Sequence, residues 1–177
     1  MKLYIRLIRT LLVALMRPRL GILDESVTGF RVWPNDLDLN LHMNNGRYLT
    51  IMDLGRVDLI ARVGLLRLMV RQRWAPVVGM ATIRFRKSLT PFQKYRLTTR
   101  VVCWDDKWTY LEQRFEAGGE TVALAYVKAV FRAKKRTLRS REVLRALGQE
   151  QRSPPMPSAI EALKLAEGLT GEKPGRV

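Results

Sequence analysis

Four strand-like stretches follow one another in the second half of the chain, and no helical pattern separates them. Residues 77–86, 94–104, 108–116 and 121–133 are rich in β-branched and aromatic residues, and turn signals (Asp105-Asp106, then Gly118-Gly119) separate the last three. Antiparallel strands can be joined by such short turns, whereas parallel strands need long crossover connections. The order therefore predicts an antiparallel α+β sheet and argues against a βαβ nucleotide-binding unit.

An earlier strand and a long helix complete the pattern. Residues 27–33 alternate as in a strand, which Pro34 ends. Apolar residues then recur at helical spacing over about residues 45–63, and Gly64 stands where a C-terminal cap is expected. A shorter helix is predicted over residues 65–74. We expect the long helix to cover one face of a sheet of about five strands.

The chain of 177 residues suits one folded domain with two basic flanks. Residues 1–24 form a basic amphipathic N-terminal segment, residues 25–136 the α+β domain, and residues 137–177 a basic region with two predicted helices and a tail. Lys and Arg total 32 against 16 Asp and Glu, a formal charge of +16, so the surface attracts anions. Cys103 is the only cysteine, which excludes an internal disulfide and suits a reducing, cytoplasmic compartment. We interpret Cys103 as a buried structural residue.

The N-terminal segment mixes leucines and isoleucines with Lys2, Arg6, Arg9, Arg17 and Arg19. A secretory signal needs an unbroken apolar core, which Arg9 interrupts. A spanning helix needs about 20 apolar residues, more than this segment offers. Two interpretations remain open: a helix lying peripherally on an anionic membrane surface, or a helix docked on its own domain.

The stretch DLDLNLHMNNGRY, residues 36–48, gathers polar side chains between the first predicted strand and the long helix. A helix start has unpaired N–H groups and the positive end of the dipole, so amides near Asn45 and Gly46 can stabilise a carbonyl oxygen that gains negative charge. Asp38 precedes them closely enough to attack that carbonyl or to take a proton from water. Asn44 or Asn45 can cap the helix. The pattern indicates acyl transfer to water.

The same residues also have a purely structural interpretation. Asp36, Asp38 and Asn40 are turn formers, Asn44 is a helix cap, and His42 is a loop histidine bonded to backbone. The two aspartates offer too few oxygen ligands for a hard cation. No Cys/His cluster has metal-site spacing, so we expect neither a metal nor a cofactor.

A known family shares this spacing of polar residues. The pattern D-x-D followed by H-x-N-N-x-x-Y is formed by Asp36, Asp38, His42, Asn44, Asn45 and Tyr48. It resembles the signature of hotdog-fold thioesterases of the 4-hydroxybenzoyl-CoA thioesterase type. In that family one strand, a long central helix and four more antiparallel strands make the domain, the order predicted over about residues 27–133. The resemblance implies that Asp38 is the catalytic carboxylate and that an amide at about Asn45 binds the thioester carbonyl.

Two features qualify the resemblance. The family most often has glycine where Leu41 stands, so we expect a narrower pocket or a reshaped loop but the same reaction. The hydrophobic, basic N-terminal extension is similar to a subgroup that includes membrane-associated animal proteins of the superfamily.

We therefore predict a hotdog-fold hydrolase that converts acyl-CoA thioesters to free acid and CoA, with Asp38 as general base or nucleophile and Asn45 as the second catalytic residue. Asp36 is expected to shape the loop. The residues expected to bind substrate are His42, Asn44, Gly46 and Tyr48. The resemblance also implies a homodimer or tetramer with sites between subunits.

The CoA phosphates would need cations, and the strand regions offer several without singling one out. The candidates are Arg84, Arg86, Lys87, Lys134, Lys135 and Arg136. A rival hypothesis is a membrane-associated protein that binds acyl chains or acyl-CoA without cleaving them. Nucleic-acid binding is not expected, because the aromatic residues follow core patterns and no known nucleic-acid motif is present.

Overall fold

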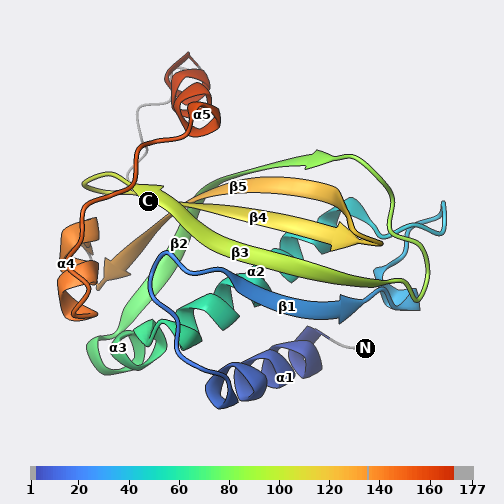
Figure 1. Ribbon diagram of the computed structural model, residues 1–177, viewed down its shortest axis with the longest axis horizontal. Coiled ribbons are helices and arrows are strands. Elements are labelled where there is room, and N and C mark those ends of the chain that lie inside the picture. The colour runs from blue at the N-terminus through green and yellow to red at the C-terminus, as the bar shows by residue number, and fades with distance from the viewer. Residues whose placement is uncertain (1–2, 135, 170–177) are drawn as a thin grey trace.

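A computed structural model describes residues 3–134 and 136–169 of the protein. The helices are α1 (Leu3–Met16), α2 (Asn45–Arg62), α3 (Leu65–Gln72), α4 (Ser140–Ala146) and α5 (Ser158–Leu169), with a 3₁₀ turn η1 at Pro34–Asp36. The strands are β1 (Ser26–Arg31), β2 (Trp74–Phe85), β3 (Lys94–Trp104), β4 (Thr109–Ala117), β5 (Glu120–Ala133) and the short β6 (Arg136–Thr137). The predicted α+β architecture is confirmed: α2 runs along one face of a curved antiparallel sheet (Figure 1).

The sheet has the strand order β1-β3-β4-β5-β2, and β6 pairs with β5. All pairings are antiparallel. The order places β1 and β2 at the two edges. It also leaves the ends of β1 and β4 and the start of α1 close to the start of α2, at the right of Figure 1.

A glycine and a buried amide seat α2 on the sheet. A Cβ on Gly55 would lie 2.6 Å from both Leu97 and Thr99 side-chain atoms, so only glycine allows this close approach. Beside it, the fully buried Gln113 donates its amide to the Met52 carbonyl at 3.0 Å and to Thr99 Oγ1 at 2.9 Å. Because a buried amide must be hydrogen-bonded, these contacts fix the position of α2 along β3 and β4.

The predicted helix over residues 65–74 is too long at its C-terminus. Arg73 adopts φ 56° and ends α3, and Trp74 already begins β2. Pro76 therefore lies inside a strand, where it pairs with Phe131 of β5. Proline is tolerated because β2 is an edge strand whose free side needs no N–H donor.

The N-terminal helix α1 docks on its own domain through its polar side. Its buried residues are Arg6, Thr10 and Ala14, and Arg17 just beyond it donates to the Val27 carbonyl at 2.8 Å. Within residues 3–134 and 136–169, no helix combines the length and the hydropathy required to cross a bilayer.

Cys103 is fully buried, as predicted, in a small cluster with Tyr110 and Ile160 of α5. Burial raises the pKa of its thiol.

Candidate functional site

The residues of the D-x-D motif lie in a narrow loop, residues 36–45, which we call the site loop. Its two arms run antiparallel: Asp38 N–H donates to the His42 carbonyl at 2.9 Å, and Asn44 N–H donates to the Asp36 carbonyl at 2.8 Å. The loop therefore returns the chain to the start of α2 within a few residues of Asp38. It brings together the carboxylate and the helix terminus that the sequence predicted as one site.

The Asp38 carboxylate is half-buried and is held by amides of its own loop. Its Oδ1 accepts the N–H groups of Asn40 at 2.9 Å and His42 at 3.3 Å. No partner for Oδ2 is found in the described part of the chain. One oxygen thus orients the group, and the other is available to a water molecule or a carbonyl carbon.

Asn44 caps α2, as the sequence predicted. Its Oδ1 accepts Gly46 N–H at 2.8 Å, and its carbonyl accepts Arg47 N–H at 2.9 Å. A Cβ at Gly46 would lie 3.1 Å from Asn44 Oδ1, so glycine makes room for the cap. The Gly46 N–H is therefore already hydrogen-bonded to Asn44, whereas Asn45 N–H has no intramolecular partner among the described residues. Of the two amides considered, only that of Asn45 is available to an oxyanion.

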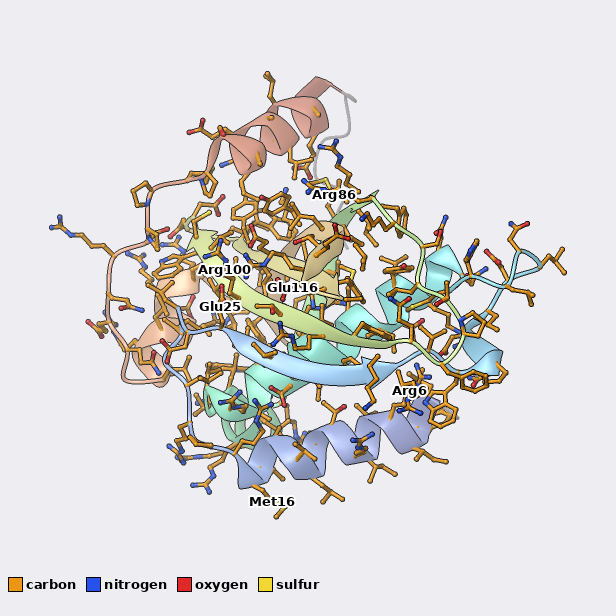
Figure 2. All side chains as sticks on the ribbon, turned by 45° about the vertical axis from the view of Figure 1, so that its right-hand side comes forward. Arg6, Met16, Glu25, Arg86, Arg100 and Glu116 are labelled. Atoms are coloured by element: carbon orange, nitrogen blue, oxygen red, sulfur yellow. The ribbon has the colours of Figure 1, made fainter. Side chains whose placement is uncertain are left out.

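A buried ion pair lies beneath the site loop. Asp36 is 1% exposed and Arg6 of α1 is 4% exposed, and the guanidinium donates to Asp36 Oδ2. The same oxygen accepts Trp33 N–H at 2.9 Å, and Arg47 Nε lies 3.8 Å from Oδ1. Figure 2 shows Arg6 at the end of α1 nearest this loop. The predicted loop-shaping role of Asp36 fits this geometry.

Arg6 is the residue of this arrangement that sequence reasoning missed. It stands 30 residues before Asp36, in a segment rich in arginines, and no local spacing distinguishes it from Arg9. Only the packing of α1 selects it.

Tyr48 lies in the core beneath the site loop. It is 2% exposed and packs edge-on against Phe85 and Phe115, with ring centroids 5.0 and 4.8 Å away. Burial raises the pKa of its hydroxyl, and a hydrogen bond with the Leu89 backbone opposes this shift. This position favours support of the loop over direct contact with substrate. His42, by contrast, has an exposed side chain.

The backbone conformation of Leu41 gives a physical reason for glycine at this position. Its φ is 58°, in the left-handed region that glycine adopts without strain. The side chain is 65% exposed and so does not fill a pocket of this chain, contrary to one of the expected effects. Leu39 at the loop tip is fully exposed as well.

An apolar cavity lies farther along α2, between this helix, the sheet and α4. It has a volume of about 320 Å³, and its lining includes Val57, Ile60, Leu111, Phe131 and Leu144. In the described residues, no group of three or more His, Cys, Asp or Glu side chains is placed to hold a metal ion.

Several solved structures with the same fold are described as thioesterases. A probable thioesterase of Escherichia coli, YbaW, superposes with a TM-score of 0.64 at 24% identity over 70% of this chain and 96% of that chain. A gentisyl-coenzyme A thioesterase gives a TM-score of 0.60 at 20% identity over 69% of this chain and 98% of that chain. These similarities identify the fold as the hotdog fold, as predicted.

Sequence comparison places the chain within a family. A model described as "Thioesterase-like superfamily" matches residues 32–163, so the chain belongs to this superfamily. Protein THEM6 of Danio rerio is 37% identical over 122 residues, 69% of this chain and 58% of that protein. The probable thioesterase YBR096W of Saccharomyces cerevisiae is 30% identical over 119 residues, 65% of this chain and 51% of that protein. The chain spans about half the length of the curated relatives it matches.

Proposed function

We propose that the protein hydrolyses acyl-CoA thioesters to a free acid and CoA. The thioester carbonyl accepts a hydrogen bond from Asn45 N–H, and the α2 dipole favours the negative charge that develops on its oxygen. Asp38 either removes a proton from an attacking water or attacks the carbonyl carbon itself. The C–S bond then breaks, and the sulfur leaves as CoA thiol after taking up a proton, which in the water route is the proton that Asp38 removed. In the nucleophilic route a water molecule then hydrolyses the acyl–Asp38 anhydride, which releases the free acid and restores the carboxylate.

One observation carries this proposal. A carboxylate oriented through a single oxygen lies in the same short loop as a helix-terminal amide without an intramolecular partner. Asp36 and Asn44 then act by holding the loop and the helix start in place.

Release of free CoA from a panel of short, long and aromatic acyl-CoAs tests the proposal. Asp38→Asn keeps the shape of the side chain but cannot act as a base, so we expect turnover to fall by about 10² to 10⁴. Asp106→Asn, at the 68% exposed carboxylate of the β3–β4 turn, serves as the control and is expected to retain full activity. Equal activity of Asp38→Asn and wild type would refute the assignment.

The apolar cavity is our candidate for the acyl tail. Its lining on α2 begins at Asp53, eight residues after Asn45, which is about 12 Å along the helix axis. A long acyl chain reaches this cavity and a short one does not. Replacement of Ile60 by Trp should therefore lower turnover of long acyl-CoAs far more than that of short ones.

A homodimer or tetramer is proposed to complete the site. Leu39 and Leu41 extend from the loop tip into solvent, so one chain encloses Asp38 incompletely. The β2 edge is 12 residues long and exposes Val78 and Phe85, each at 43%. An unpaired apolar edge of this length is a ready template for a second copy. Sedimentation equilibrium tests this, and a monomer at micromolar concentration would contradict it.

Peripheral binding to an anionic membrane is proposed for α1. Its polar side faces the domain, and apolar side chains cover the opposite side. The most exposed of these are Tyr4, Ile5, Ile8, Leu12, Leu15 and Met16. Figure 2 shows Met16 directed away from the domain. Arginines flank this stripe, as expected for a helix in a lipid headgroup layer.

Vesicle cosedimentation tests the membrane proposal. Replacing Ile8 and Leu12 by Ser removes about 2 kcal/mol of apolar transfer free energy, so binding to vesicles containing phosphatidylglycerol should weaken roughly thirtyfold. Leu165→Ser on α5, where the leucine is 68% exposed, is the matched control. Wild-type protein that stays unbound would contradict the proposal.

A membrane-associated binding protein without activity is the second candidate. The apolar cavity beside α2 and the exposed apolar stripe of α1 suit such a protein. Acyl-CoA binding without CoA release from any substrate, by wild type and Asp38→Asn alike, would select this alternative.

A further inference from the structure

A basic cleft lies at the end of the molecule that carries the site loop, between α1 and the β1 edge of the sheet. Its volume is about 640 Å³. Four exposed cations line it: Arg9 of α1, Arg31 of β1, and Lys94 and Arg96 of β3. Figure 1 shows the starts of α1 and β3 and the end of β1 at the same end as the site loop.

These positive charges are placed together at a cost in stability. Arg31 and Lys94 are direct cross-strand partners in the β1–β3 register. Like charges in directly opposite positions destabilise a sheet. No ion pair to any of the four cations is found within the described ranges. Glu116, labelled in Figure 2, lies opposite Arg96 on β4 and also lines the cleft, where it accepts the Thr98 hydroxyl at 3.2 Å. The cleft therefore keeps a strong positive excess.

Glycines leave part of the cleft wall without side chains, and Trp33 adds an aromatic one. A Cβ on Gly29, the cross-strand partner of Arg96, would meet no atom within 4 Å. Gly118 and Gly119, in the β4–β5 turn, form another part of the wall without side chains. Trp33 also lines the cleft, and an aromatic face can stack on a nucleobase. A bulky anion with a flat ring fits this chemistry.

Arg6 connects the cleft to the site loop. It lines the cleft and donates to Asp36, whose carbonyl holds Asn44 at the start of α2. The family match begins at residue 32, so Arg6, Arg9, Gly29 and Arg31 all precede it. Part of the cleft lining thus lies before the matched residues, and Lys94 and Arg96 lie within them.

We propose that the basic cleft binds the 3′-phosphate and pyrophosphate groups of the CoA nucleotide while the thioester lies at Asp38. This inference rests on the proposed function. Two of the cations predicted from the sequence are weaker candidates, because Lys87 is paired with Glu120 and Arg136 with Glu142. Lys135 lies outside the described residues.

Comparison of an acyl-CoA with the acyl-pantetheine of the same acyl group tests the inference, because only the first carries the nucleotide. In an Arg31→Gln/Lys94→Gln double variant we expect KM for acyl-CoA to rise about tenfold, because two exposed charge pairs with phosphate are lost. Its kcat, and both constants for acyl-pantetheine, should stay unchanged. Arg141→Gln/Arg152→Gln removes the same charge from exposed arginines elsewhere and is the control. A KM that rises equally for both substrates, or for neither, overturns the inference.

Direct binding separates this inference from the proposed function. Calorimetry with adenosine 3′,5′-bisphosphate should detect binding to wild type that Gly29→Glu and the double variant lose, even if no thioester is cleaved. If neither thioester is cleaved but the bisphosphate still binds, the proposed hydrolase activity is refuted and the assignment of the cleft as a nucleotide site is retained. Inorganic phosphate that competes as well as the bisphosphate would overturn nucleotide binding. The inference is also overturned if the Arg31→Gln/Lys94→Gln variant loses binding to vesicles but keeps binding to the bisphosphate. That result would assign the cleft to lipid headgroups.

Discussion

Breaking the ion pair beneath the site loop should be among the most destabilising single changes available in this protein. In Arg6→Met, Asp36 remains 1% exposed but loses the guanidinium, which is itself 4% exposed. Removing one partner of a buried pair costs about 3–5 kcal/mol, because an uncompensated charge stays behind. Trp33 N–H at 2.9 Å and Arg47 at 3.8 Å still contact the carboxylate. We therefore expect about 3 kcal/mol of unfolding free energy to be lost, at the lower end of that range.

Urea unfolding at constant pH measures this loss, and two further variants identify its cause. Asp36→Asn combined with Arg6→Met removes both charges and should recover most of the loss, since no buried charge is left unpaired. Arg9→Met, one turn away on α1 and exposed, should change stability by less than about 0.5 kcal/mol. A loss below about 1 kcal/mol for Arg6→Met, the size expected for an exposed pair, would refute the reasoning.

Three further predictions concern the loop, the helix seat and one exposed carboxyl. Leu41→Gly relieves a left-handed backbone at φ 58° and should stabilise the protein by up to about 1 kcal/mol in urea unfolding; a clear loss would contradict the strain. Gly55→Ala places a Cβ 2.6 Å from Thr99 Oγ1 and should cost about 1–3 kcal/mol in the same assay. Hydrogen bonding to Arg136 lowers the pKa of Glu142 to about 2, so NMR titration should return this pKa toward its ordinary 4.5 in Arg136→Gln. Because the folded pKa is the lower one, the pair stabilises the protein above pH 4.5, and the stabilisation is lost as the pH falls from there through about 2.

The order of elements could be predicted because it depends on local patterns. The alternation in residues 94–104 and the helical spacing after residue 45 match the observed β3 and α2 closely. Prediction was wrong at Trp74, since a left-handed Arg73 and pairing with β5 override a pattern that also suits a helix. The site loop was predicted from residue types that each have a distinct local role: Asn44 as a cap, Gly46 beside it and Asp38 in a turn.

The sequence by itself determined the class of fold and the place of the candidate site, because hydrophobic period, caps and turns act over a few residues. Tertiary structure alone decided which arginine pairs with Asp36 and which side of α1 faces outward. It also decided that Arg31, Lys94 and Arg96 meet Arg9 in one cleft. These outcomes join segments that are far apart in the sequence, such as Arg6 and Asp36 or Arg31 and Lys94, and several arginines could take each place. Only the packing of α1 and the register of β1 on β3 distinguish among them.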